Sequence, residues 1–451
     1  MEYTNQFGER CSTERVLQYL LQSGLLGKEN PCGLFISRDV LMSNINEIKS
    51  AFPEPFFSHR YAVKANPIKE LLRIVKENGF GCECASFGEV YNALSSGMEE
   101  KDIVYDSPLK LEKDLRFCFE RGIHINFDNM QEMEMGYELY CTMKEQGQVK
   151  EGHIGLRINS QYGSGAIEAT STATPTSKFG LPLKDTDFDE LVSMFRKWPA
   201  LDALHSHVGS QGVDLHLMVG GVKCIVDLAD RINHILGRKQ ITVLDIGGGL
   251  PVDYKHDESN QISLEYSRHL RQEVPRLFSG DFIVVTEMGR AVVATSGWFV
   301  SRIEYTKIAS GRLIGITHAG GNMFVREVYM GSTWFHPITV YDGSGCRKTA
   351  DVKCVDLAGP LCFSGDLIAK GLDLPSFQQG DYLVYHHTAA YSIGMYSMYN
   401  SIATPPVYLY SVAKETNEVT VKLIKREESV EQITTFWDFF LSCFENSIPR
   451  Y

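Results

Sequence analysis

The chain has 451 residues, with 44 Lys and Arg against 56 Asp and Glu, which gives a formal net charge of −12 at pH 7. That acidic balance excludes a strongly basic nucleic-acid binder, and a hydrophobic content of 43% excludes a disordered chain. The amino terminus, MEYTNQFGERCSTERV, carries early charges and no apolar run long enough for a signal peptide or a membrane span. We therefore expect a cytoplasmic protein that binds neither nucleic acid nor a membrane.

The eleven cysteines follow no regular spacing. Cys82, Cys84 and Cys362 lie in apolar or glycine-rich stretches, as is typical of buried, reduced thiols in a cytosolic protein. The Cys82-x-Cys84 pair has no second pair of ligands at a suitable spacing. The sequence therefore predicts no metal site.

Eight short apolar or β-branched segments recur along the first two thirds of the chain, and each is a candidate strand. They are residues 61–66, 81–86, 102–107, 124–128, 153–158, 203–208, 242–246 and 282–287. The segments between them have helical spacing, as in residues 68–78, after which Gly79 is a stop signal. Strand and helix alternating eight times predict the α/β class and a (β/α)8 barrel.

These candidate strands end in polar or ionisable residues. A barrel gathers the carboxyl ends of its strands at one rim, where its active site lies. Lys64 has small and apolar neighbours there, and a desolvated lysine is a usable amine nucleophile, although a solvated surface lysine is the ordinary alternative. The residues near the strand ends are Lys64, Glu83, Asp106, Asp128, Arg157, His207, Asp245 and Glu287.

Two glycine-containing segments follow late strands, DIGGG from Asp245 to Gly249 and EMGR from Glu287 to Arg290. Backbone amides in such segments can converge on a phosphate without interference from side chains. A tight turn is the structural alternative for the three glycines. A structural ion pair between Glu287 and Arg290 is the structural alternative for the second segment.

After the eighth segment the sequence changes to alternating strands separated by Gly, Pro and Asp turns, which predicts a C-terminal antiparallel β domain. Residues 31–37 predict an early strand, which either pairs with this domain or leads into the barrel. We place the barrel at residues 37–285, and a β-sandwich or β-barrel-like domain at residues 1–36 and 286–451.

Six motifs together resemble those of the fold-type III pyridoxal-phosphate decarboxylases, the group that contains diaminopimelate, ornithine and arginine decarboxylases. In the family order they are YAVKAN, HSHVGSQ, DIGGG, EMGR, GPLCFSGD and AAYSIGMYSMYN. The similarity runs from about residue 31 to residue 406 and is greatest to a divergent, diaminopimelate-decarboxylase-like branch. It implies a barrel of the alanine racemase-like type, pyridoxal 5'-phosphate as cofactor, and a homodimer with active sites shared between the subunits.

The resemblance also implies roles for individual residues. Lys64 would hold the cofactor covalently, His207 would stack on its ring, and Glu287 would keep its ring nitrogen protonated. Cys362, from the β domain of the partner subunit, would help to control reprotonation once carbon dioxide has left. Further cofactor contacts would come from Glu83, Arg157, Ser210, Gly248, Gly249, Gly289, Arg290 and Tyr391.

Structural roles stay open for three of these residues. His207 could be a core histidine that donates to a backbone carbonyl. Cys362 could be inert packing. Arg157 could only brace Glu83 or its neighbours.

The residue after the cysteine departs from the family pattern. Diaminopimelate decarboxylases usually carry a glutamate there, which contacts the distal amino group of the substrate, whereas this chain has Phe363. A neutral aromatic side chain cannot form the charge-assisted hydrogen bond that a desolvated ammonium group needs. Recognition of a distal amine should therefore be weak or reversed.

The residues that would bind a distal carboxylate are retained in part. Arg290 and Arg326 match the two family arginines, but Glu327 replaces a proline and Met330 replaces the tyrosine of the second motif. Tyr329 would supply that tyrosine in another register. The expected substrate contacts are thus Arg290, Arg326, Tyr329, Phe363, Asp366 and Tyr391.

The sequence as a whole predicts a decarboxylase for an amino acid, or an amino-acid conjugate, that bears a distal carboxylate. A meso-diaminopimelate decarboxylase is the first alternative. A racemase on the same barrel and a catalytically inactive relative that binds a regulatory partner are the others. The joint presence of Lys64, His207, Glu287 and Cys362 argues against the inactive relative, and the GPLCFSGD motif argues against the racemase.

Overall fold

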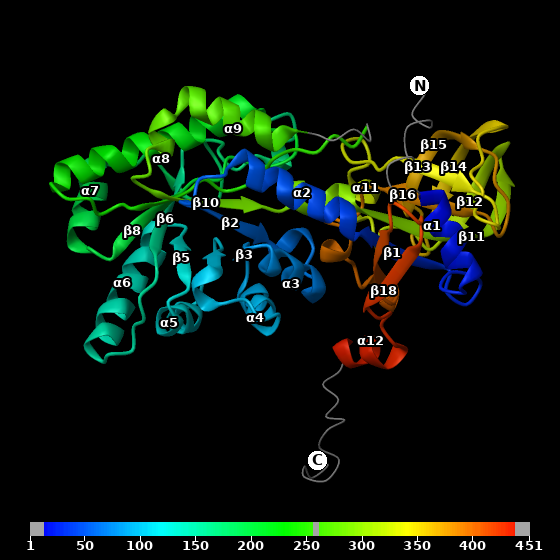
Figure 1. Ribbon diagram of the computed structural model, residues 1–451, viewed down its shortest axis with the longest axis horizontal. Coiled ribbons are helices and arrows are strands. Elements are labelled where there is room, and N and C mark those ends of the chain that lie inside the picture. Colours follow the sequence, from blue (N-terminus) through cyan, green and yellow to red (C-terminus); the bar gives the residue numbers. More distant parts are fainter. Residues whose placement is uncertain (1–12, 256–260, 438–451) are drawn as a thin grey trace, which may run out of the picture. The chain divides into compact units, whose positions relative to one another are not determined.

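The computed structural model describes residues 13–255 and 261–437 (Figure 1). The chain forms two compact units. Of the described residues, the barrel unit comprises 40–253 and 261–295, and the β unit comprises 13–39, 254–255 and 296–437. The predicted division at residues 37 and 285 stays a prediction, and strand β10 (Ile283–Met288) runs across the second of these positions.

The barrel unit contains a closed ring of eight parallel strands, as predicted. Around the ring these are β2 (Phe57–Ala62), β3 (Gly81–Cys84), β4 (Ile103–Asp106), β5 (His124–Phe127), β6 (Ile154–Asn159), β8 (Leu201–His205), β9 (Val243–Asp245) and β10. Pairing of β10 with β2 and of β5 with β6 closes the ring. A short strand, β7 (Leu181–Pro182), pairs with β6.

Helices alternate with these strands and lie outside them (Figure 1). In α3 (Lys69–Glu77) the apolar residues Leu71, Leu72 and Val75 are buried on one face, and Gly79 takes a left-handed conformation just beyond the helix. No helix in the described part of the chain is long and apolar enough to cross a membrane. The other helices are α2 (Arg38–Ala51), α4 (Phe87–Ser95), α5 (Glu112–Arg121), α6 (Met130–Glu145), α7 (Phe188–Lys197), α8 (Leu215–Leu236), α9 (Ile262–Glu273) and α10 (Arg290–Val293).

The first barrel strand ends earlier than predicted. We expected a strand over residues 61–66, but β2 ends at Ala62 and the next three residues form a short 3₁₀ turn. The neighbouring strand β10 ends at the same level: its last residue, Met288, pairs with Tyr61, and Ala62 has a strand partner on the other side only, in Glu83 of β3. Lys64 therefore lies on a turn at the rim of the barrel.

The β unit is a mostly antiparallel sheet, as predicted. Its main path runs β15 (Leu367–Pro375), β14 (Val352–Ala358), β12 (Arg312–Thr317), β11 (Gly297–Ala309), β1 (Cys32–Ser37), β17 (Val407–Val412) and β18 (Val419–Lys425). β16 (Tyr382–His386) pairs with β11 and with β13 (Ile338–Tyr341). The early strand β1 pairs with β11 and β17, so it belongs to this unit.

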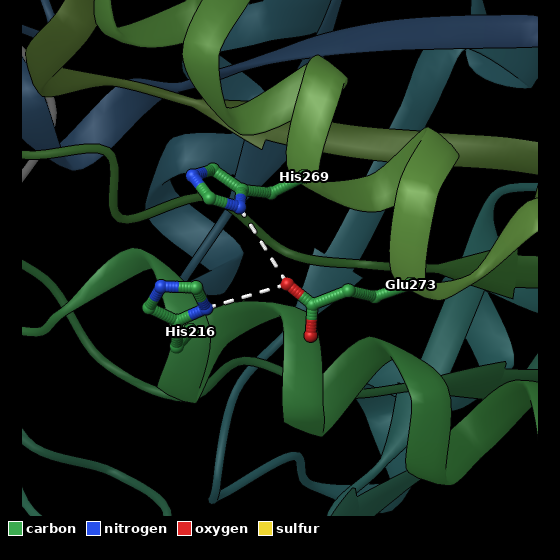
Figure 2. A group of neighbouring side chains, drawn as sticks. All are labelled: His216, His269 and Glu273. Atoms are coloured by element: carbon green, nitrogen blue, oxygen red, sulfur yellow. Dashed lines mark ion pairs between the residues drawn. The ribbon is translucent and has the colours of Figure 1, made fainter.

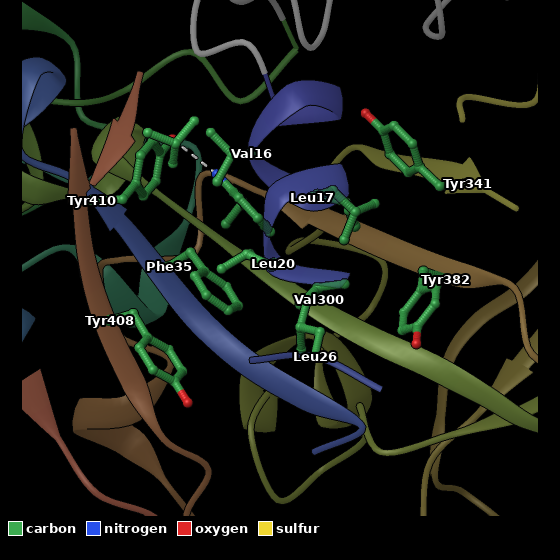
Figure 3. Packing of buried hydrophobic residues seen from close by; sticks show 13 residues of the cluster. Val16, Leu17, Leu20, Leu26, Phe35, Val300, Tyr341, Tyr382, Tyr408 and Tyr410 are labelled. Carbon is green, nitrogen blue, oxygen red and sulfur yellow. Dashed lines mark hydrogen bonds between the residues drawn. The ribbon is translucent and has the colours of Figure 1, made fainter. Parts of the chain in front are cut away.

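An aromatic core holds the β unit together (Figure 3). The ring of Phe35, on β1, stacks between Trp298 on β11 and Tyr408 on β17, with ring centroids 4.8 and 4.9 Å apart. The indole N–H of Trp298 donates to the hydroxyl of Tyr410 at 3.0 Å, so the polar atom of this buried ring is satisfied. Helix α1 (Thr13–Gln22) covers the cluster with Val16, Leu17 and Leu20.

Candidate functional site

An ion pair between two neighbouring strands orients the predicted nucleophile. Lys64 follows β2, Glu83 lies in β3, and Lys64 Nζ is 2.9 and 3.0 Å from the two carboxylate oxygens. The side chain of Glu83 is fully buried, whereas that of Lys64 is 41% exposed. Burial raises the pKa of Glu83 to about 8, although the charge of Lys64 works in the opposite direction. The pair therefore holds the lysine amine at the rim, accessible to a ligand.

Four buried side chains of alternating charge form a row inside the barrel. Arg157 Nη1, on β6, donates to Asp106 Oδ2, on β4, at 2.9 Å. His205, on β8, places Nδ1 3.5 Å from Asp106 Oδ1 and Nε2 3.6 Å from Glu287 Oε2, on β10. The imidazole thus bridges two carboxylates through its opposite nitrogens. Arg157 thus contacts Asp106, on the strand next to that of Glu83.

The charge states of this row follow from its contacts. Burial opposes a charge on His205, but Asp106 and Glu287 outweigh it and raise the pKa of His205 well above its ordinary value. Burial also opposes ionisation of the carboxylates, but Arg157 and His205 lower the pKa of Asp106, and His205 lowers that of Glu287. The arrangement is therefore an imidazolium ion between two carboxylates. We did not select His205 from the sequence, and its only signal was its place in the HSHVGSQ motif.

A third carboxylate, Asp245 at the end of β9, behaves differently. Its Oδ1 accepts the backbone N–H of Gly247 at 3.0 Å, and its Oδ2 accepts Nδ2 of Asn126 at 3.3 Å. Burial and the nearby charge of Glu287 raise the pKa of Asp245 well above its ordinary value. The pKa shift of Asp245 is therefore opposite in direction to those of Asp106 and Glu287.

His207 is held as a neutral ring. The backbone N–H of Gly248 donates to Nδ1 of His207 at 3.1 Å, which places the proton of the imidazole on Nε2. Burial and the positive charge of Arg157 lower the pKa of His207 to about 3. A neutral imidazole at the rim is suited to stacking on a flat ligand.

The triple glycine allows very close backbone contact between strand ends. A Cβ added to Gly248 would lie 1.8 Å from the carbonyl oxygen of Glu287, and one added to Gly249 would lie 1.8 Å from that of Gly209. Gly249 also has φ +98°, which favours glycine. The tight-turn interpretation therefore accounts for both positions, and phosphate binding by Gly248 and Gly249 stays a prediction.

The second predicted phosphate segment contacts the loop after β8. Arg290 begins α10 immediately after Gly289, and its Nη2 donates to the hydroxyl oxygen of Ser210 at 3.4 Å. A Cβ on Gly289 would lie 2.9 Å from that of Ala62 at the end of β2. The structure thus brings Ser210, Gly289 and Arg290 to the same rim as Lys64.

In the β unit, two predicted substrate residues lie together. The guanidinium group of Arg326, in α11 (Val325–Tyr329), lies 4.5 Å from the ring centre of Tyr391 and 4.7 Å from that of Trp334. Tyr391 has φ +61°, a strained conformation for a bulky residue and one that is enriched at functional sites. Glu327, which replaces the family proline, pairs with His336 at 3.1 Å.

Cys362 and Phe363 lie on one exposed loop of the β unit. The ring of Phe363 is parallel to that of Tyr329, with centroids 5.7 Å apart and planes 5° apart, and it meets Tyr399 edge-on. The backbone N–H of Cys362 donates to Asn400 Oδ1 at 2.7 Å, so the GPLCFSGD and AAYSIGMYSMYN motifs contact each other. The position beside the cysteine is therefore an aromatic surface.

Asp366 braces this loop from within. It is buried, and its two carboxylate oxygens accept the backbone N–H groups of Gly321 and Leu361 at 2.6 and 2.7 Å. Burial raises the pKa of Asp366. Since both oxygens are engaged within the loop, the structure favours a bracing role, whereas the sequence had suggested a substrate contact.

The donor set at the rim of the barrel fits pyridoxal phosphate. Glu287 Oε1 is buried and has no hydrogen-bond partner among the described residues, while the other oxygen faces the imidazolium of His205. Such a carboxylate can accept a hydrogen bond from a protonated ring nitrogen. The exposed amine of Lys64 and the neutral ring of His207 supply the partners for an aldehyde and for an aromatic face.

Comparisons with known proteins show the family to which the chain belongs. The model of the pyridoxal-binding domain of pyridoxal-dependent decarboxylases matches residues 38–294, more than half of the chain. The diaminopimelate decarboxylase of Bacteroides thetaiotaomicron is 28% identical over 83% of this chain and 92% of its own length. That of Pseudomonas aeruginosa is 29% identical over 83% and 84%, respectively. The crystal structure of a Helicobacter pylori diaminopimelate decarboxylase mutant in complex with L-lysine has the same fold, with a TM-score of 0.78 at 24% identity, covering 92% of this chain and 99% of that one.

Proposed function

We propose that this chain, which belongs to the family of pyridoxal-dependent decarboxylases, removes the α-carboxyl group of an amino acid that bears a second, distal carboxylate. The reaction class is a carboxy-lyase reaction on an amino acid, and the cofactor is pyridoxal phosphate. The distal carboxylate of the substrate is our proposal.

The residues of the barrel rim divide the work of such a reaction. When bound, the cofactor accepts the electrons that the departing carboxyl group leaves behind. Lys64 would supply the amine that holds the cofactor, and Glu83 orients that amine. Glu287, whose pKa is lowered by His205, would accept a hydrogen bond from the ring nitrogen and so stabilise its proton. His207 would pack on the ring as a neutral partner.

Other residues at the rim of the barrel would bind the phosphate group of the cofactor. Arg290 and Ser210 are joined by a hydrogen bond, and a guanidinium group is suited to bidentate binding of phosphate oxygens. Backbone amides of Gly249 and Gly289 would complete the contacts. Gly248 is not included in this group, because its backbone N–H already donates to Nδ1 of His207.

One observation carries the proposal about the substrate, namely the aromatic surface beside Cys362. Phe363 packs flat on Tyr329 at 5.7 Å and contacts Tyr399 edge-on, so this surface offers no carboxylate to a distal ammonium group. Leaving a desolvated ammonium group without a partner costs on the order of 1–3 kcal/mol or more. A substrate without that amine avoids this cost.

Arg326 supports the other half of the proposal. Its guanidinium group lies against the rings of Tyr391 and Trp334, which restricts its motion and reduces its hydration. A carboxylate bound to such a group forms a strong, charge-assisted pair. We propose that Arg326 binds the distal carboxylate.

Two substrates that differ only in the distal amine test this proposal. Carbon dioxide release should be measured with L-2-aminopimelate and with meso-diaminopimelate, at equal concentrations and with saturating pyridoxal phosphate. We expect kcat/KM to be at least tenfold higher for L-2-aminopimelate. The substitution Phe363→Glu should shift the ratio of the two kcat/KM values toward meso-diaminopimelate by about 10- to 100-fold. The reason is that a charged hydrogen bond contributes about 1.5–3 kcal/mol.

Phe363→Gln is the matched control, because glutamine has the shape of glutamate without its charge. It should leave the preference for L-2-aminopimelate in place. A wild-type enzyme that uses meso-diaminopimelate with the higher kcat/KM would refute the proposal. It would support the runner-up, a meso-diaminopimelate decarboxylase, which the names of the relatives favour.

The proposal also covers the oligomeric state of the protein and its location in the cell. We propose a homodimer with shared active sites, on the strength of the family motifs, and sedimentation equilibrium at micromolar concentration would measure it. We propose a cytoplasmic location because the nine cysteines within the described residues are all free, which is typical of a reducing compartment.

A further inference from the structure

Two helices of the barrel unit bring together three side chains that play no part in the proposed decarboxylation (Figure 2). His216 lies in the first turn of α8, and His269 and Glu273 lie one turn apart at the end of α9. The spacing of four residues places His269 and Glu273 on the same face of their helix. α8 packs against α9, which brings His216 to that face.

One oxygen atom is common to both contacts in this cluster. Glu273 Oε1 is 3.3 Å from His216 Nδ1 and 3.5 Å from His269 Nδ1. Both distances exceed the usual length of an N–H···O hydrogen bond, which is about 2.7–3.2 Å. They match the separation of about 3.3–3.5 Å between neighbouring ligands of a tetrahedral ion whose bonds are about 2.0–2.1 Å long.

We propose that His216, His269 and Glu273 form a surface binding site for a divalent transition-metal ion such as Zn²⁺, separate from the decarboxylase site. Two imidazoles and a carboxylate are a ligand set that zinc uses with three protein ligands and a water molecule. The side chains of His216 and Glu273 are 67% and 44% exposed, which leaves room for that water.

The contrast with the buried row around His205 supports this assignment. His205 meets its two carboxylates through opposite ring nitrogens, at 3.5 and 3.6 Å, so no single ion can account for both distances. In the surface cluster, both Nδ1 atoms face the same oxygen (Figure 2). The surface cluster therefore has two contacts that one ion can explain together, whereas the two contacts of His205 cannot be explained by one ion.

The surroundings of His269 fit the role of a ligand. A metal-bound imidazole usually directs its other N–H toward a carboxylate or carbonyl group. Glu265 Oε1, one turn earlier on α9, is 3.9 Å from Nε2 of His269. The exposed side chain of Arg268 lies 3.4 Å from the same nitrogen and would turn toward solvent when that nitrogen carries the proton.

The bound ion would join the start of α8 to the end of α9. It would therefore stabilise the folded barrel in proportion to its concentration, by mass action.

Calorimetric titration of the metal-free holoenzyme with Zn²⁺ at pH 7.5 tests the proposal. We expect one site with a dissociation constant below about 100 μM. His216→Ala, His269→Ala and Glu273→Gln should each weaken binding by at least about tenfold, which corresponds to about 1.4 kcal/mol. Each substitution should also remove the increase in the thermal midpoint that Zn²⁺ causes in the wild-type protein.

His234→Ala is the matched control, since His234 is an exposed histidine of the same helix, about 27 Å away along α8. It should change the affinity by less than twofold. Because Cys346, Cys354 and Cys362 are exposed thiols, the titration should be repeated with Co²⁺, whose absorption spectrum distinguishes nitrogen and oxygen ligands from thiolate. Absence of saturable binding, a thiolate spectrum, or unchanged affinity in the three variants would each overturn the proposal.

Discussion

Replacing His205 with glutamine should remove the positive charge that lies between two buried carboxylates. At the observed 3.6 Å between His205 Nε2 and Glu287 Oε2, and with an effective dielectric constant of about 20, the attraction is about 4–5 kcal/mol. Loss of one partner from a buried pair costs about 3–5 kcal/mol, because the other charge stays buried. We therefore expect His205→Gln to lower the free energy of unfolding by about 3–5 kcal/mol near pH 6.

The size of this loss should depend on pH in a defined direction. The pKa of folded His205 is above its ordinary 6.5, so its contribution to stability is complete below pH 6.5 and is lost as the pH rises through the folded value. The pKa of folded Glu287 is below its ordinary 4.5, so its contribution is complete above pH 4.5 and is lost under more acidic conditions. The difference between wild type and variant should therefore be largest between about pH 4.5 and 6.5.

His59 provides a matched control within the same barrel. It is buried on β2, and its Nδ1 is 2.9 Å from Thr286 Oγ1. Burial lowers the pKa of His59 to about 4, so its neutral form is the stable one and its contribution is lost as the pH falls below 6.5. The effect of His59→Gln should therefore decrease with acidification over the range in which the effect of His205→Gln reaches its maximum.

Urea unfolding of the cofactor-free protein between pH 4 and 9 measures both effects. A second measurement uses cofactor labelled with ¹⁵N in its ring, because the ¹⁵N chemical shift reports whether that nitrogen is protonated. We expect a protonated nitrogen in wild type and a shift toward the neutral form in His205→Gln. If the variant binds cofactor with an unchanged ¹⁵N shift and shows a stability loss independent of pH, His205 does not control the charge of Glu287.

Three further substitutions test the packing and the charges elsewhere. Gly248→Ala should cost about 2–3 kcal/mol in urea unfolding and weaken cofactor binding, because the new Cβ would lie 1.8 Å from the carbonyl oxygen of Glu287; unchanged cofactor affinity would contradict the geometry. Leu20→Ala should cost about 2–5 kcal/mol, since Leu20 is fully buried in the aromatic core of the β unit; a loss below 1 kcal/mol, measured by urea unfolding, would contradict that burial. Lys110→Ala should cost about 3–5 kcal/mol, because it leaves the buried carboxylate of Glu132 without its partner at 3.1 Å, and adding Glu132→Gln should recover part of the loss.

The barrel was predictable from sequence because its signal is local and repeated. Each strand is a short apolar segment followed by a polar residue, and each helix has its own periodicity and stop signal. The end of β2 was not predictable in this way, because Val63 and Ala65 are as apolar as the strand before them. Its limit coincides with the end of β10, far away in the chain, whose last residue pairs with Tyr61.

The residues of the candidate site also differ in whether the sequence alone could predict them. Lys64 and Glu287 were visible in the sequence because motifs contain them and because they lie near the carboxyl ends of strands. His205 was not selected, since its role depends on Asp106, about a hundred residues away, lying across the barrel from it. A sequence shows that a histidine is near a strand end, but only the closed ring shows which carboxylates it meets.

The balance of charge in the barrel explains why its three neighbouring carboxylates differ. Asp106 has cationic neighbours in Arg157, His205 and Lys110, and Glu287 has them in His205 and Lys64, so the pKa of each is lowered despite burial. Burial and the nearby charge of Glu287 raise the pKa of Asp245, whose hydrogen bonds come from the uncharged N–H groups of Gly247 and Asn126. His205 lies within 3.6 Å of the two carboxylates whose pKa is lowered, Asp106 and Glu287. The position of this one imidazole therefore favours an anionic Glu287, which is what a protonated ring nitrogen requires.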